Sequence, residues 1–153
     1  MNPDGPYLSV AALCEAVLHE KDERISCIRF ADQFEVTIGG DIPDPLPSVQ
    51  FRLNALLAFK SGPFVGTKTI KIILKNPDGK IANTTQPQSY PAIFKGREHG
   101  ANLIVSMDIV TDKSGDYAID VFLDDEMFTQ IPFKVTIKRM IPDEPQLPSS
   151  EKA

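Results

Sequence analysis

The sequence predicts an all-β fold, an antiparallel β-sandwich of about 7–9 strands. Apolar and polar residues alternate with a period of two along most of the chain, which is the pattern of half-buried strands. Thirteen prolines punctuate the sequence, and all but one of them fall where this alternation stops. The 153 residues, 42% of them hydrophobic, suffice for one domain with a sizeable core. We expect that domain at residues 1–139, followed by a disordered Pro-rich tail at 140–153.

Residues 9–20 fit two structures. A helix would begin at Ser9 as its N-cap. Its apolar face would then consist of Val10, Leu13, Cys14, Val17 and Leu18. A strand would place Leu8 and the following even-numbered residues on one side, and a turn at Asp22-Glu23 would lead into a second strand at 25–34. The alanine content favours the helix, and periodicity alone does not decide between the two.

Two runs of alternation follow. Val49–Phe59 carries an apolar residue at every odd position, which predicts a long half-buried strand. Ile70–Leu74 is a second strand that ends at Asn76-Pro77-Asp78-Gly79. The proline presets the φ of a type I turn, and the glycine can take the left-handed conformation that closes a hairpin loop. The return strand is expected at 80–85.

The last part of the chain predicts strands at 103–109, 117–123 and 131–137. We expect a three-residue turn at Asp124, Asp125 and Glu126, because it places all apolar partners on one face. The resulting pairs are Leu123 with Met127, Ile119 with Ile131, and Tyr117 with Phe133. Pro132 lacks an amide donor, so its strand is expected to begin near this residue or to lie at an edge.

Three stretches together resemble a family of small bacterial proteins that carry a domain of unknown function. They are AALCEAVLHEKDERISCIRFAD, IILKNPDGKI and SGDYAIDVFLDDEMFTQIPFKV, and they cover most of residues 7–138. The resemblance implies a compact β-sandwich and favours a strand at 9–20. It supplies no catalytic or binding residues.

The third stretch also resembles the tyrosine corner of immunoglobulin-like domains, in which Asp-x-Gly-x-Tyr precedes a strand. Gly115 and Tyr117 are in step, but Lys113 stands at the aspartate position, Ile119 at the cysteine position, and the chain has no tryptophan. This implies an immunoglobulin-like or C2-like arrangement and excludes an antibody-type domain. We predict that the Tyr117 ring is buried and that its hydroxyl bonds a backbone group upstream of Gly115.

Charge and hydropathy exclude several partners. The net charge of −5 without a basic stripe argues against nucleic acid. No apolar run is long enough to span a membrane, and the first thirty residues lack the pattern of a signal peptide. Cys14 and Cys27 are expected to be small buried hydrophobes rather than a disulfide. We therefore predict a cytoplasmic protein without a nucleic-acid or membrane partner.

Catalytic and transition-metal patterns are missing from the sequence. A nucleophile needs a nearby base, and the two histidines, His19 and His99, stand in no recognised catalytic motif. No Gly-x-Ser-x-Gly, Cys-x-x-Cys or His-x-x-x-His occurs, so neither a hydrolase site nor a zinc site is indicated. We expect no enzyme and no cofactor.

Calcium offers an alternative function, because C2-type sandwiches bind it through loop aspartates. The candidate aspartates are Asp108, Asp112, Asp116, Asp120, Asp124 and Asp125. Asp124 and Asp125 fall at one end of a predicted strand, and Asp112 and Asp116 fall at its other end. A site would therefore need Asp41 and Asp44 to converge with one acidic loop. The alternative is therefore a small-molecule or Ca²⁺-binding C2-like domain.

The longest stretch without alternation is 85–102, which is expected to be a loop. It contains residue types that anchor interfaces, namely Tyr90, Phe94, Arg97 and His99. The sequence thus favours a non-catalytic protein-binding or assembly module, with this loop as its candidate interaction surface. An edge strand could also pair with a second copy of the chain.

Overall fold

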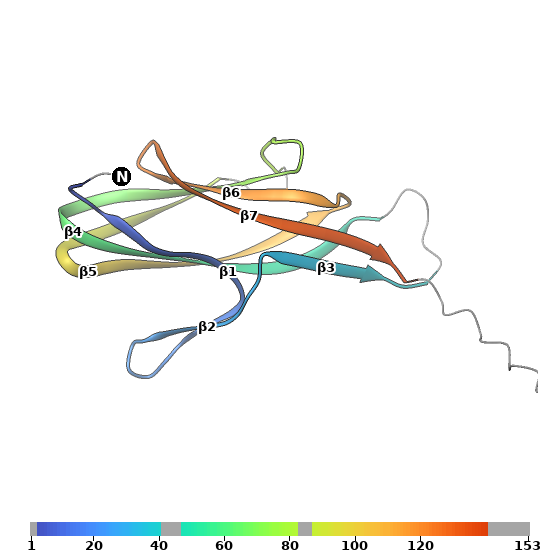
Figure 1. Ribbon diagram of the computed structural model, residues 1–153, viewed down its shortest axis with the longest axis horizontal. Helices are drawn as coiled ribbons and strands as arrows, with labels where there is room; N and C mark the ends of the chain where they lie inside the picture. Colours follow the sequence, from blue (N-terminus) through green and yellow to red (C-terminus); the bar gives the residue numbers. More distant parts are fainter. Residues whose placement is uncertain (1–2, 41–46, 83–86, 141–153) are drawn as a thin grey trace, which may run out of the picture.

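The computed structural model describes residues 3–40, 47–82 and 87–140, and within them it contains seven strands and no helix (Figure 1). The strands are β1 (Tyr7–His19), β2 (Ile25–Phe30), β3 (Gln33–Ile38), β4 (Val49–Lys75), β5 (Gln88–Thr111), β6 (Gly115–Leu123) and β7 (Glu126–Arg139). The all-β prediction is confirmed.

The strands form one continuous sheet that curls into a half-barrel. Its order is β2-β1-β4-β6-β7-β3, with β5 paired to β4 beside this path. Neighbours run antiparallel except β3 and β7, which are parallel. The prediction of a wholly antiparallel arrangement is therefore wrong for this pair, and the strands lie in a single curled sheet rather than in two separate sheets.

The fold is built around a long ribbon in which β4 pairs with β5 from Val49–Thr111 to Ile72–Gln88. The first half of β4 pairs on its other edge with β1, and the second half with β6. Between the halves the ribbon bends, at register shifts flanking Gly62. A Cβ at Gly62 would lie 2.3 Å from the Tyr7 ring. Only glycine therefore permits this close packing at the bend.

The core lies inside the curl, between the two halves of the ribbon and β6 and β7. Phe59 from the first half contacts Phe94 and Phe128, with ring centroids 6.2 and 5.6 Å apart. Tyr117 and Phe133 stack at 5.4 Å. The largest fully buried apolar side chains are Tyr117, Phe59, Phe94, Leu53, Leu57, Ile70, Ile109, Ile119, Val121 and Val135. These are mostly the odd positions that alternation placed inside.

The N-terminal segment is the strand β1, as the resemblance favoured. Its predicted buried face is only partly correct, because Cys14 is buried but Val10 and Leu18 are 37% and 45% exposed. A register shift between Leu8 and Val10 moves the odd-numbered Ala11 and Leu13 to the core side, where they join Leu8. A bulge reverses the side-chain direction of all following residues. The strand predicted at 25–34 is also divided into two. Its first part, β2, pairs with β1, and the chain then crosses to the other end of the sheet, where β3 pairs with β7.

The residue pairs predicted for the β6–β7 hairpin are confirmed at its base, but the predicted turn is wrong. Tyr117 pairs with Phe133 and Ile119 with Ile131. The turn has two residues, Asp124 and Asp125, so that Leu123 pairs with Glu126 rather than with Met127. A register shift after Val121 restores the predicted pairs. Asp124 adopts a φ of 53°, which aspartate tolerates better than most residues, and this allows the tighter turn.

Two further predictions have mixed outcomes. The turn at 76–79 is confirmed, since Gly79 donates its N–H to the Asn76 carbonyl at 2.9 Å and has a φ of 79°. Of the return strand at 80–85, only a bridge from Ile81 to Lys75 is present, and 83–86 lies outside the described residues, as does the tail at 141–153. Pro132 lies within β7 and not at its start. It does precede Lys134, where the pairing of β7 with β3 begins, so among the described residues no strand pairs with β7 on that side at Pro132.

Candidate functional site

The segment 85–102 is not the loop that the sequence predicted, because most of it belongs to β5. Phe94 is 1% exposed and lies in the core, and Tyr90 packs against it from a half-buried position. Arg97 and His99 are exposed where the ribbon bends. Tyr90, Ala92 and Phe94 do alternate inward, but Pro91 within this run and Gly96 after it are residues that usually interrupt a strand. The four residues therefore do not form one surface.

Tyr117 confirms the tyrosine-corner prediction. Its hydroxyl donates to the Lys113 carbonyl at 2.7 Å, upstream of Gly115, and contacts the Thr111 hydroxyl at 2.8 Å. The residue is 2% exposed, and burial raises the pKa of its phenol, although the Thr111 hydrogen bond opposes the shift. The side chain therefore fastens the end of β5 to the start of β6, which is a structural role.

The acidic turn is tied to β4. Asp124 accepts the Thr69 N–H at 2.9 Å and lies 3.3 Å from the Lys68 ammonium. The backbone hydrogen bond, followed by that from Lys68, lowers the pKa of Asp124. Its carboxylate is thus engaged in holding the turn. No group of three metal-binding side chains occurs among the described residues, and Asp41 and Asp44 lie outside them.

Asp120 is the most deeply buried charged side chain that the structure describes, at 1% exposure. Its Oδ2 lies 2.5 Å from Lys75 Nζ, and its Oδ1 accepts from Gln130 Nε2 at 2.7 Å. Burial alone would raise the pKa of Asp120, but the hydrogen bonds from Lys75 and Gln130 outweigh it and hold the pKa below its usual value. The paired charge joins three neighbouring strands, so Asp120 has a structural role and is not available as a general acid.

Neither cysteine is disulfide-bonded. Burial, with a smaller contribution from Cys27, raises the pKa of Cys14 to about 11. The Cys14 thiol is therefore protonated at neutral pH, and a protonated thiol is a poor nucleophile. This residue packs as a small hydrophobe, as predicted.

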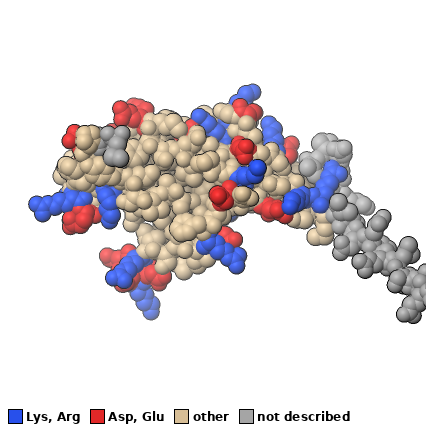
Figure 2. Space-filling model, viewed as in Figure 1, with Lys and Arg blue, Asp and Glu red and all other residues tan. Residues whose placement is uncertain are grey.

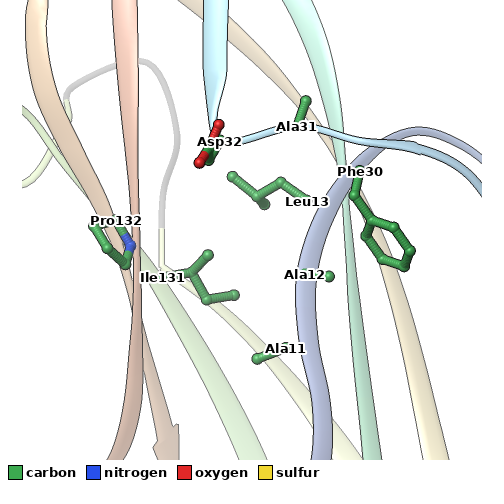
Figure 3. Close-up of a pocket in the computed structure, with 8 residues that line it drawn as sticks. All are labelled: Ala11, Ala12, Leu13, Phe30, Ala31, Asp32, Ile131 and Pro132. Atoms are coloured by element: carbon green, nitrogen blue, oxygen red, sulfur yellow. The ribbon is translucent and has the colours of Figure 1, made fainter.

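A shallow groove of about 300 Å³ lies on the open side of the half-barrel, between β1 and β7 (Figure 3). Its lining residues are Ala11, Ala12, Leu13, Phe30, Ala31, Asp32, Ile131 and Pro132. Asp32 is the one titratable residue among them, and the remaining side chains are apolar. Charged side chains on this face lie mostly towards its periphery (Figure 2). No thiol, hydroxyl or imidazole side chain occurs among the described residues that line the groove, and Asp32 is the one titratable group there.

The sheet edges differ in how they are protected against pairing with another chain. Natural edge strands are kept short or carry charges, prolines and bulges. β2 and β3 are only six residues each. In β2, Arg29 also has a φ of 54°, which departs from regular strand geometry. The first half of β5 contains Pro91, Lys95 and the bend. These edges are guarded.

The second half of β5, residues 101–111, has no proline, no bulge and a single charge, and we call it the open edge. It reads ANLIVSMDIVT, without proline or glycine, and pairs with β4 in unbroken register. Its one charge, Asp108, accepts two hydrogen bonds from Arg52, at 2.8 and 3.1 Å. Ser106 donates to Asn54 at 2.5 Å. Among the described residues no other strand pairs with β5.

The register shows which backbone groups face outward. The Leu13 carbonyl accepts the Ala31 N–H at 3.0 Å and so points away from β4. Leu13 is paired with Ala55, so the backbone groups of Ala55 also point away from β1 and towards β5. Because backbone groups alternate in direction along a strand, the N–H and C=O groups of the even-numbered residues of β4 at 54–58 point to β1, and those of the odd-numbered residues point to β5. Their partners on β5 are also odd. The N–H and C=O groups at the open edge therefore belong to Asn102, Ile104, Ser106, Asp108 and Val110.

The side chains of these edge residues are exposed or half-buried. A second strand laid along the open edge would thus meet regularly spaced donors and acceptors. It would also extend the row of buried side chains formed by Val105, Met107 and Ile109. The sequence did show an alternating strand here, but not that one side of it lacks a neighbour.

Comparisons with known proteins are sparse. No protein-family model and no curated protein matches the chain. It is similar to part of a β-glucosidase from Listeria innocua solved in complex with glucose, with a TM-score of 0.43, 9% identity, and coverage of 88% of this chain and 17% of that one. For a β-glucosidase from Kluyveromyces marxianus the TM-score is 0.36, with 13% identity and coverage of 58% and 14%.

The chain thus spans less than a fifth of either β-glucosidase. Similarity at these scores carries no argument about activity. None of the described residues forms a helix long and apolar enough to cross a membrane.

Proposed function

We propose that this chain is a non-catalytic assembly module that pairs the open edge of β5 with an extended strand of another polypeptide. The single observation that carries the proposal is the open edge at residues 101–111, which lacks the protection seen at β2, β3 and the first half of β5. Strand addition of this kind draws affinity from main-chain hydrogen bonds and specificity from alternate side chains. The free thiols of Cys14 and Cys27 suit the cytoplasmic setting that we propose for it.

Two features of the open edge favour binding. The strand is already held in its extended form by β4 and by the polar pairs Arg52–Asp108 and Asn54–Ser106, so little conformational entropy is lost on association. Its outward side chains are mostly uncharged. The polar groups described above, at Asp120, Asp124 and Tyr117, are all engaged in structural contacts, which leaves the edge as the best-supported functional surface.

Affinity capture tests this proposal. Tagged full-length chain is expected to retain a polypeptide partner, and Ile104→Lys is expected to lose it, because a charge on an edge strand opposes pairing. The matched control is Ile28→Lys on β2, where the isoleucine is 41% exposed and the edge is guarded. The proposal fails if Ile104→Lys retains the same polypeptides as the wild type, or if the chain shows small-molecule turnover without any polypeptide partner.

A further inference from the structure

We propose that the strand occupying the open edge is that of a second copy of this chain, paired antiparallel through residues 103–111 with Met107 at the two-fold axis. This inference rests on the proposed function and names its partner. Antiparallel pairing of two identical strands is isologous, so each contact occurs twice. The curled sheet would then continue from one copy into the other through their β5 strands.

The side chains select this register. Centred on Met107, the outer face sets Ile104 against Val110 of the second copy, and Ser106 against its Asp108. On the core side Val105 faces Ile109. The Asp108 carboxylate is already paired with Arg52 and faces the small Ser106 side chain rather than a second charge, while apolar residues meet apolar ones. Directly opposed pairs of this kind stabilise a sheet by about 0.2–1 kcal/mol each.

Neighbouring registers are less favourable. Centring on Ser106 would place Ile104 opposite the carboxylate of Asp108. Centring on Asp108 would set the two carboxylates directly opposite each other, which destabilises a sheet. Centring on Val105 would leave the half-exposed Val110, at 38%, without a partner. Of the four registers compared, only the one centred on Met107 avoids these mismatches.

The charges of the strand also permit self-pairing. A chain with a net charge of −5 is repelled by its own copy unless the contact is locally neutral. Asp108 is the one charged residue in 101–111, and Arg52 of the same copy neutralises it at 2.8 Å. Two copies can therefore approach along this strand without a like-charge contact between unpaired groups.

Light scattering coupled to size-exclusion chromatography tests the dimer. Across a dilution series the wild-type chain is expected to shift from twice its 16.9 kDa mass to the monomer mass. Ile104→Lys and Val110→Glu should each raise the dissociation constant about tenfold, since two symmetric pairs are lost in each. The control Ile28→Lys should leave the dissociation constant unchanged.

Mixing the two edge variants tests the register. In a mixed dimer Lys at 104 of one copy faces Glu at 110 of the other, and the second pair remains Ile104 with Val110. We expect the mixture to dimerise at least as well as the wild type, although each variant alone does so poorly. Failure of this rescue would overturn the Met107-centred register, and circular dichroism of each variant will show that the β-sheet is retained.

Two outcomes separate this inference from the proposed function. A wild-type chain that stays monomeric at every concentration would overturn the dimer, while an edge-dependent partner in affinity capture would still support strand pairing with a different protein. If the chain dimerises but Ile104→Lys leaves the dissociation constant unchanged, this edge is not the interface. The inference is then wrong.

Discussion

The two halves of β5 pair with the same neighbour and bury side chains in the same core, yet they differ at their free edge. The first half, residues 88–97, carries Pro91, Lys95 and the irregular backbone of Gly96 and Arg97, both with positive φ. The second half, 101–111, is regular, without proline, and has one neutralised charge. Packing toward β4 therefore does not explain the difference. Protection against a further strand explains it, and only one half lacks that protection.

Phe94→Ala gives the largest effect that we expect and tests whether the first half is structural. Its ring is 1% exposed and contacts Phe59 and Phe64, so truncation should reduce the free energy of unfolding by about 3–5 kcal/mol. The control, His99→Ala, should stay within about 0.5 kcal/mol. Urea unfolding measures both. A small effect of Phe94→Ala would restore the surface loop that the sequence predicted.

Gly100→Ala tests the point where the two halves meet. A Cβ at this position would lie 2.1 Å from the Phe59 carbonyl oxygen, so the backbone must shift, which costs about 1–3 kcal/mol. Gly39→Ala is the control, because nothing lies within 4 Å of its Cβ position, and it should change stability by less than about 0.5 kcal/mol. Equal values for the two variants would show that the close approach at the bend is not needed.

The same contrast explains how far the sequence could predict the structure. Alternation correctly located Val49–Phe59, 103–109 and the base of the β6–β7 hairpin, because a half-buried strand imposes that pattern. It failed at 85–102, where Pro91 and Gly96 interrupt a strand that tolerates them at a free edge or a bend. Such tolerance depends on which neighbour is missing, and a single sequence does not contain that information.

Faces and turns were harder to predict for a related reason. The bulge after Leu8 and the two-residue turn at Asp124-Asp125 each shift a strand by one residue, and the apolar pattern alone does not mark such shifts. The open edge was predicted only as a general possibility, since edge status is a property of the assembled sheet. By contrast Tyr117 could be placed, because its Gly-x-Tyr spacing fixes a local contact.

Tyr117→Phe tests the attachment of the open edge at its C-terminal end, where Thr111 contacts the phenol. Loss of the hydroxyl should reduce the free energy of unfolding by about 0.5–1.5 kcal/mol, because the Lys113 carbonyl loses a buried donor. Tyr90→Phe in the first half is the comparison. Its hydroxyl bonds the Gln88 side chain, which water can replace, so a smaller loss is expected. A larger loss at Tyr90 would contradict this assignment.

Asp108→Asn tests the smallest effect, the neutralised charge on the open edge. The hydrogen bonds from Arg52 lower the pKa of Asp108, so the pair stabilises the folded state fully above the unfolded pKa of about 3.9. This contribution is lost as the pH falls through the lower, folded pKa. Both side chains are largely exposed, so the contribution is small and decreases with added salt.

The free energy of unfolding of Asp108→Asn should therefore lie slightly below that of the parent chain at neutral pH and approach it in acid. Measuring both in the Ile104→Lys background removes any contribution from association. The control is Asp116→Asn, an exposed aspartate on β6, which should change the free energy of unfolding at neutral pH by less than about 0.5 kcal/mol. If Asp108→Asn instead strengthens self-association, its charge protects the edge after all, and the contrast between the two halves of β5 would be one of degree.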